Sequence, residues 1–415
     1  MASRALAERD PLSAFARSVR AIWLALVIAF FSGCFFQLLT GGETGLLVKQ
    51  SDSAIYLLIV AGIYGGLGTL IVFYAYPVVS RLGRHPFAFI FIVTSALSLL
   101  LSENISAILG MNVALQATVA LALGAAVVFP PKQIVNVVAL VLTAAAVCSA
   151  IYVIGGWPGA LYLDPLERTT VLGTTALQGI FGHKNALGSA MGLLFVIVVN
   201  SQWQRARKIS IGVLAAALCV LSNSVTSILA MAMAASATLL GRRVLRAGPT
   251  ASVLAIFPLA VFGALIFLNY DEILSFFGRD AQLTGRTSAW SIWWDAFRAR
   301  PLFGYGFGGF FFDSSNAPVR TVERTAGFSL VHFHNGYMEV LSYIGVVGGV
   351  VFARIIYVAL QNAWRIPGGT YDVPPGLGAL IFLMILALGE NSLMYFQSMG
   401  TLLIFYYYFY ENPLA

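Results

Sequence analysis

Residues 133–155 read QIVNVVALVLTAAAVCSAIYVIG, an apolar run without a single charged side chain. A helix needs about 20 such residues to cross roughly 30 Å of hydrocarbon. The rest of the chain has the same character, because 59% of its 415 residues are hydrophobic and only 10% are charged, against about 25% charged in an average soluble domain. This composition excludes a disordered chain, a disulfide scaffold and an ordinary soluble enzyme. A β-barrel is disfavoured because barrel strands alternate apolar and polar residues.

The sequence therefore predicts an all-α polytopic membrane protein with about twelve transmembrane helices. The expected spans are 21–40, 54–79, 87–102, 105–129, 133–155, 183–201, 209–223, 225–241, 250–270, 336–360, 375–392 and 396–411. Residues 1–415 form a single integral membrane domain with a cytoplasmic tail over 1–20, a first periplasmic loop over 156–182 and a large late periplasmic loop over 271–335.

The positive charges favour a cytoplasmic N-terminus. With that orientation fourteen cations fall in cytoplasmic segments, whereas Lys49, Arg168 and Lys184 fall in the short external connections, as expected when cytoplasmic loops collect Lys and Arg. The net charge of +7 thus reflects orientation in a lipid bilayer and indicates no nucleic-acid partner. Cys34, Cys148 and Cys219 lie inside apolar stretches, so neither a disulfide framework nor a thiolate metal site is expected.

The long external segment 271–335 contains a predicted helix. Thr287 or Ser288 can cap it and Pro301 ends it. Trp290, Trp293, Trp294 and Phe297 recur at helical spacing and give one aromatic face. This face either lies in the membrane interface, where tryptophan is enriched, or packs on the protein core.

Two motifs suit binding of a phosphate or sugar. The first is FGHKNALG at 181–188, where His183, Lys184 and Asn185 stand at the mouth of a span; a snorkelling lysine and a capping Asn are the alternative. The second is TGRTSAW at 284–290, followed by RPLFGYG at 300–306. Arg286 precedes a helix N-terminus, which favours anions, and the glycines at 304, 306, 308 and 309 could let the backbone approach a ligand.

A third motif, HFHNGY at 332–337, closes the long loop where a span begins. Its two histidines lack a nearby acidic or thiol partner set, so no metal is expected. A general base is favoured instead, because histidine is the side chain whose ordinary pKa lies nearest neutrality. The spacing Gly345-x-x-x-Gly349 permits close helix packing.

Two smaller polar features interrupt the apolar runs. SNSVTS at 222–227 is a polar break between two spans, expected at the external face. Glu390-Asn391 ends the eleventh span, where a carboxylate is either functional or a structural partner.

These motifs together resemble the Wzy-type polysaccharide polymerases and O-antigen ligases of bacterial inner membranes. His334-Asn335 followed by Gly345 and Gly348 is similar to the His-Asn…Gly-x-x-Gly pattern of the ligases. The stretches at 182–188 and 285–306 look like the ExoQ-like exopolysaccharide polymerase branch. The resemblance covers roughly residues 180–350. One position departs from it: where many relatives have an arginine in a Ser-x-Ser-Arg-Thr stretch, this chain has Val225.

The resemblance implies a C-type glycosyltransferase-like helical fold and a metal-independent, inverting glycosyl transfer at the periplasmic face, with no cofactor. The implied donor is a glycan on undecaprenyl diphosphate, and the acceptor is a new lipid-linked repeat unit in a polymerase or lipid A–core in a ligase. Implied partner proteins are a polysaccharide co-polymerase or chain-length regulator and a flippase. By similarity, His334 is the base or the acceptor-positioning group and Arg286 contacts the diphosphate. The supporting residues for substrate binding are His183, Lys184, Asn185, Arg279, Arg300, Arg320, Arg324, His332 and Asn335.

Three other functions stay open at this stage. A ligase would share the same motifs. A secondary transporter or lipid-glycan flippase would also have about twelve spans, with Glu390 coupling an ion, although no half-chain symmetry is evident. A non-catalytic scaffold of an export machine would not need the three motif clusters.

Overall fold

The computed structural model describes residues 11–34, 54–101, 105–163, 173–247, 286–312, 332–366, 373–394 and 398–411. Within these ranges the chain is helical, with one isolated antiparallel bridge between Leu161 and Leu177. The helices in chain order are α2 (Pro11–Ser32), α4 (Ala54–Phe73), α5 (Ala75–Arg84), α6 (Pro86–Leu97), η2 (Ser98–Leu101), α7 (Ile105–Val128), α8 (Pro131–Ile154), α9 (Lys184–Asn200), α10 (Arg205–Leu221), α11 (Val225–Ala247), α14 (Arg286–Ala299), α15 (Gly309–Phe312), α17 (Gly336–Trp364), α18 (Pro375–Leu386) and α19 (Met399–Phe409).

Membrane-capable helices confirm a polytopic membrane protein. Five helices in the described ranges are long and apolar enough to cross a membrane: α2, α4, α7, α8 and α17. A sixth results if α5 and α6, bent by 90° at His85, count as one span. Shorter apolar helices fall on the predicted spans 183–201, 225–241, 375–392 and 396–411. The predicted span 250–270 lies outside the described residues, so twelve spans remain a prediction.

The helix boundaries follow local chemistry. Pro86, Pro131 and Pro375 each occupy the first turn of their helix, where a missing N–H costs nothing. Ser398 begins α19 by accepting a hydrogen bond from the Gly400 N–H, and Asn335 begins α17 in the same way. The predicted span 54–79 is split, because α4 ends at Phe73 and α5 forms a separate helix.

Helix α19 is the centre of the bundle. All eleven of its residues, Met399–Phe409, are buried, and it packs against α7, α17, α18 and α2. A helix that is apolar on every side belongs in a core. Two of its tyrosine hydroxyls are hydrogen-bonded, since that of Tyr406 donates to the Phe129 carbonyl at 2.9 Å and that of Tyr408 accepts from the Ala88 N–H at 3.3 Å.

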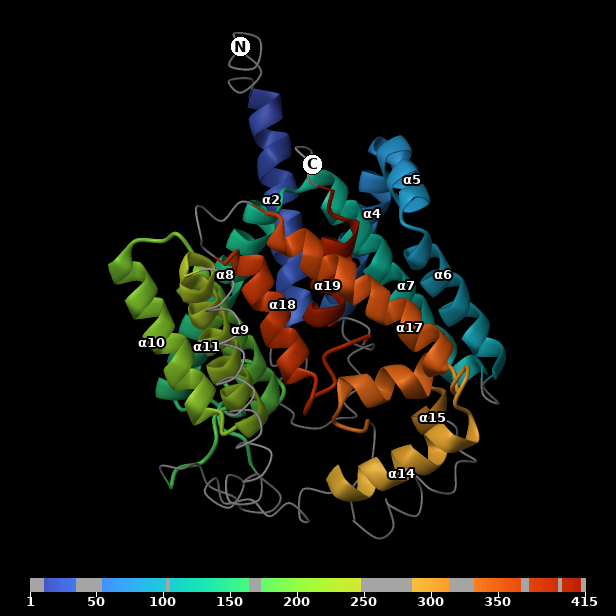
Figure 1. Cartoon of the computed structure of the whole chain (residues 1–415). Coiled ribbons are helices and arrows are strands. Elements are labelled where there is room, and N and C mark those ends of the chain that lie inside the picture. Colours follow the sequence, from blue (N-terminus) through green and yellow to red (C-terminus); the bar gives the residue numbers. More distant parts are fainter. Residues whose placement is uncertain are drawn as a thin grey trace.

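The two ends of the bundle carry different elements. The beginning of α2 and the whole of α5 lie at one end, and α14 and α15 lie at the opposite end (Figure 1). The predicted loop helix is confirmed as α14, which starts at Arg286, slightly before the expected caps Thr287 and Ser288. Its aromatic face packs partly on the core, because Trp290 and Trp293 are half-buried while Trp294 is 49% exposed.

A sharp bend in α17 shapes the α14 end. Gly345 has φ 61° and ψ −168°, which interrupts the helix, and the segment 301–306 docks into the break. The Tyr305 and Gly306 N–H groups donate to the carbonyls of Ser342 and Tyr343, and the Val346 and Val347 N–H groups donate to the carbonyls of Pro301 and Leu302. A Cβ at position 345 would overlap the Leu302 backbone. Gly345 therefore serves backbone-to-backbone docking.

Gly304 and Gly306, in the segment before this bend, also allow close backbone approach. Gly304, Gly306 and Gly308 all have positive φ, and a Cβ at Gly304 or Gly306 would meet the Ser342 or Ser98 carbonyl at 2.5 Å. The expectation that these glycines admit a ligand is wrong for Gly304 and Gly306, because the protein's own backbone occupies the space. The conformations are ones that residues with a Cβ rarely adopt.

Candidate active site

The histidine motif forms a tight turn at the start of α17. His334 has φ 54°, a left-handed conformation that is uncommon for a residue with a Cβ. Asn335 caps α17 by accepting from the N–H groups of Tyr337 and Met338, and its amide donates to the Leu388 carbonyl at 3.1 Å. Phe333 points the other way and is fully buried. The turn thus directs His332 and His334 to one side, with ring centroids 4.0 Å apart.

A small aromatic core fixes this turn to α14. Phe333, Phe310, Ala289 and Ala296 form a buried cluster. The Trp290 indole donates to the Phe333 carbonyl, and the Trp293 indole donates to the Met338 carbonyl, both at 3.0 Å. Such paired indoles both pack and orient the backbone they contact.

Arg286 begins α14, one helical turn before Trp290. Since a helix rises about 1.5 Å per residue, the Arg286 backbone lies roughly 6 Å along the axis from the backbone of Trp290, whose indole contacts Phe333. The backbones of the two predicted catalytic residues, Arg286 and His334, are therefore held at the same end of the molecule.

Glu390 joins the histidine turn to the first motif. Its Oε2 lies 4.0 Å from His334 Nδ1, and its Oε1 accepts a hydrogen bond of 2.8 Å from Asn185 Nδ2. Its side chain is only 13% exposed. Glu390 was expected at the end of a helical span, but α18 ends at Leu386 and Glu390 lies in the non-helical stretch between α18 and α19. A carboxylate there can face two other segments at once.

The structure does not place Lys184 of the first motif as a snorkelling lysine, whose amine would reach solvent. His183 caps α9, because its Nδ1 accepts from the Asn185 N–H at 3.1 Å. Lys184 is 3% exposed, with its Nζ 4.6 Å from the centre of the Tyr162 ring, whereas the alternative expected a lysine that reaches solvent and a capping Asn185. His183 packs edge-on against the same ring at 4.7 Å.

The polar break at 222–227 also packs on the first motif. Ser222, Asn223, Ser224 and Ser227 are buried, and a Cβ at Gly188 would meet the Ser222 and Ser224 side chains at 2.7 Å. This stretch therefore lies against α9, and its position at the external face stays a prediction. Val225, the position of the arginine in relatives, is buried at the start of α11.

The remaining predicted arginines are only partly covered by the structure. The Arg300 guanidinium stacks 4.7 Å from the centre of the Tyr305 ring, and the Tyr305 hydroxyl donates to the Ala296 carbonyl at 3.0 Å. Burial raises the pKa of Tyr305 and the nearby Arg300 opposes this shift. Arg279, Arg320 and Arg324 lie outside the described residues. Among the residues that are described, no group of three His, Cys, Asp or Glu side chains is placed to hold a metal.

The fold and the site define a class of protein: a multi-pass helical membrane protein with a titratable cluster at one end of the bundle. Comparisons with known proteins narrow this class. A sequence model of the O-antigen ligase family matches residues 169–353. The chain is also 29% identical over 274 residues to the exopolysaccharide production protein ExoQ of Rhizobium meliloti strain 1021, an alignment that covers 60% of each chain. The chain thus spans less than two thirds of that relative's length. The two matches support a Wzy/ExoQ-like family, as the motifs predicted.

Both matches include part of the described cluster. The family match covers the motif at 181–188, helix α14, the histidine turn and the bend at Gly345, but ends before Glu390. Sequence reasoning singled out Glu390 without a partner for it. The pairing with His334 and Asn185 was not foreseeable, because Asn185 and Glu390 stand 205 residues apart.

Proposed function

We propose that this protein is a polysaccharide polymerase of the bacterial inner membrane. It transfers a growing glycan from undecaprenyl diphosphate to a new lipid-linked repeat unit at the periplasmic face, without a metal or another cofactor. The observation that carries the proposal is the convergence of Asn185, Glu390 and His334 beside the helix that Arg286 begins. This cluster supplies a base and its orienting carboxylate next to a helix N-terminus suited to anions.

His334 acts as the general base in this proposal. Its Nδ1 faces the Glu390 carboxylate at 4.0 Å, so Nε2 is the atom that receives the proton of the acceptor hydroxyl. The Nδ1 contact is longer than a hydrogen bond, and such contacts tighten when substrate binds. Glu390 then stabilises the imidazolium that forms, and the Asn185 amide holds Glu390 in place.

The bond changes follow from this arrangement. The acceptor oxygen forms a bond to the anomeric carbon of the donor glycan, and the bond from that carbon to the diphosphate oxygen breaks. The diphosphate leaves with the electron pair, so negative charge develops where the site needs cations. Arg286 and the N–H groups at the start of α14 meet this charge. Attack opposite the leaving group inverts the anomeric centre.

A second candidate is the O-antigen ligase reaction, which the matched family's description favours. It would use the same base and the same donor, with lipid A–core as the acceptor. The ExoQ-like similarity favours the polymerase.

Reconstitution of the full chain in proteoliposomes tests the proposal. The vesicles receive undecaprenyl-diphosphate-linked repeat units, with lipid A–core added in a parallel sample. The proposal predicts a ladder of longer glycans on the lipid carrier without lipid A–core. Products found only on lipid A–core would make the protein a ligase, and movement of the substrate across the bilayer without a new glycosidic bond would make it a transporter.

A further inference from the structure

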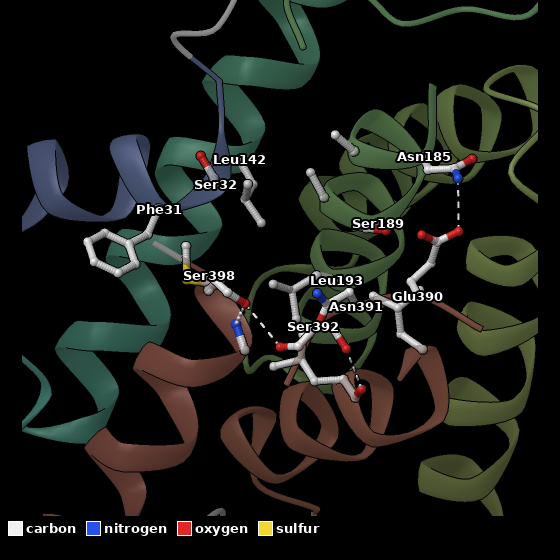
Figure 2. Close-up of a pocket in the computed structure, with 16 residues that line it drawn as sticks. Phe31, Ser32, Leu142, Asn185, Ser189, Leu193, Glu390, Asn391, Ser392 and Ser398 are labelled. Atoms are coloured by element: carbon white, nitrogen blue, oxygen red, sulfur yellow. Dashed lines mark hydrogen bonds between the residues drawn. The ribbon is translucent and has the colours of Figure 1, made fainter. Parts of the chain in front are cut away.

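A cavity of about 260 Å³ opens beside Glu390, inside the bundle. Its walls come from α2, α8, α9, α18, the non-helical stretch after α18 and the start of α19. Figure 2 shows Glu390 at its edge, joined to Asn185, with Asn391 and Ser392 at the centre and Phe31 on the far side. Because Glu390 lines the cavity and also faces His334, the cavity adjoins the proposed base.

The lining combines two kinds of side chain. Leu142, Leu193, Leu383 and Leu386 are apolar, whereas other lining residues supply hydroxyls, amides and one carboxylate. Ligand sites commonly combine a large apolar surface with a few placed polar groups. Among the described residues that line the cavity there is no Lys, Arg or His, and the acidic group among them is the Glu390 carboxylate. Such a lining disfavours a phosphate and suits a neutral ligand with hydroxyl groups.

Asn391 indicates that the cavity takes such a ligand. Both polar atoms of its amide, Nδ2 and Oδ1, are buried, and neither has a hydrogen-bond partner among the described residues. Asn185, on the same cavity, differs because its amide donates to Glu390. Buried polar groups in native proteins almost always have a partner. Asn391 is one of the residues that line the cavity, and a rotation of its side chain would bring the amide donor group and acceptor to a hydroxyl pair on a sugar ring.

We propose that this cavity is the subsite for the reacting sugar of the acceptor, with the Asn391 amide pairing its hydroxyls and the leucine side chains of the lining covering its C–H groups. The assignment to the acceptor rests on the proposed polymerase function. The reacting sugar of the donor carries a diphosphate on its anomeric carbon, which the Glu390 carboxylate would repel. The reacting sugar of the acceptor stands at the other end of its repeat unit from the diphosphate.

Equilibrium binding tests the subsite without requiring catalysis. The full chain in lipid nanodiscs is titrated with a panel of neutral methyl hexopyranosides, and with inorganic pyrophosphate as the anionic probe, by saturation-transfer NMR. We expect at least one glycoside to bind the wild type. Asn391→Leu should lower the affinity for that glycoside by about tenfold or more and leave the affinity for pyrophosphate unchanged. Leu193→Phe, which fills part of the cavity, should lower the affinity for the same glycoside, so the answer does not depend on one variant folding.

Asn362→Leu is the matched control, because the Asn362 amide donates to the Tyr407 and Tyr408 carbonyls away from the cavity; it should keep glycoside binding. The proposal is overturned if no glycoside of the panel binds, which leaves Asn391 paired with water alone, or if both cavity variants bind it as the wild type does. A pyrophosphate affinity that falls with Asn391→Leu would also overturn it. A protein that binds the glycoside but forms no glycosidic bond would refute the polymerase and retain the sugar site.

Discussion

Two carboxylates at opposite ends of the bundle, those of Glu411 and Glu390, have different surroundings. Glu411, after α19, accepts two hydrogen bonds from the Arg84 guanidinium, at 2.8 and 2.7 Å. Arg81 lies 3.7 Å away and His85 lies 3.3 Å away. Glu390 is more buried, and its partners include the neutral Asn185 amide and His334 at 4.0 Å.

This difference indicates that the ion cluster around Glu411 stabilises the fold, whereas the cluster around Glu390 is suited to take part in a reaction. The arginine pairing lowers the pKa of Glu411 and raises the pKa of Arg84, so the negative charge of Glu411 is already compensated. Next to Glu390 stands an asparagine whose amide is buried without a partner in the described residues. Polar groups left incompletely paired in a protein interior are where substrate contacts are expected.

His334→Ala should have the largest effect on the α14 end. Loss of a positioned general base typically costs about 10²–10⁴ in rate, and we expect a fall of that size in kcat for glycan extension by the reconstituted protein. His332→Ala is the matched control and should lose far less. Equal losses for the two variants would contradict the assignment of the base.

Arg286→Ala should lower transfer by roughly 10²–10³, the typical cost of one group that meets developing negative charge. Arg286→Lys should recover part of the activity, because lysine retains the charge but not the planar fork of donors. The rate is measured with the same lipid-linked donor. Full activity in Arg286→Ala would remove the arginine from the diphosphate site.

Gly345→Ala should destabilise the protein by about 3 kcal/mol or more, since the methyl group combines a positive φ with overlap on the Leu302 backbone. Gly349→Ala is the matched control on the same helix. Its Cβ would meet only the Leu341 Cδ2 at 2.9 Å, a side-chain end that can move. Thermal unfolding in detergent compares the two, and similar melting temperatures would contradict the docking of 301–306 into the bend.

Glu390→Gln should lower kcat by about 10–100-fold, which is the typical effect of losing a partner that orients a functional side chain. KM and the melting temperature should stay close to the wild type, because glutamine is isosteric and retains an oxygen for the Asn185 amide. A merely structural role would instead lower the melting temperature and spare kcat.

Glu411→Gln should have the smallest effect, a fall in melting temperature of about 1–2 °C at pH 7 without loss of transfer activity. The pKa of Glu411 is lower when folded than its ordinary value of 4.5. Its stabilisation is therefore present above pH 4.5 and disappears as the pH falls through the folded value. A difference between variant and wild type that persists under strongly acidic conditions would contradict the ion cluster.

The sequence predicted what depends on local pattern. Apolar runs gave the helices, and the spacing of Trp290, Trp293 and Phe297 gave α14 and its aromatic face. Both residues of the Asn185–Glu390 pair lie in polar motifs that stand out in the sequence, although the sequence does not indicate that they pair. In each case composition or helical periodicity carries the signal.

What the sequence could not predict depends on contacts between distant segments. The burial of Lys184 against Tyr162, the docking of 301–306 into the bend at Gly345 and the contact of Glu390 with His334 have no periodic signature. The turn imposes the left-handed backbone of His334, and a histidine at this position does not predict such a conformation. The cavity beside Asn391 likewise requires six chain segments to be placed first.

The central claim is that glycosyl transfer occurs at the Glu390–His334 end and that the Glu411 cluster only stabilises the fold. Its most direct test is the extension rate of the lipid-linked glycan by wild type, Glu390→Gln and Glu411→Gln, reconstituted side by side at pH 7. The account predicts longer glycans at the full rate with Glu411→Gln and at about 10–100-fold lower rate with Glu390→Gln. Equal rates in the two variants, or no extension by the wild type, would contradict it.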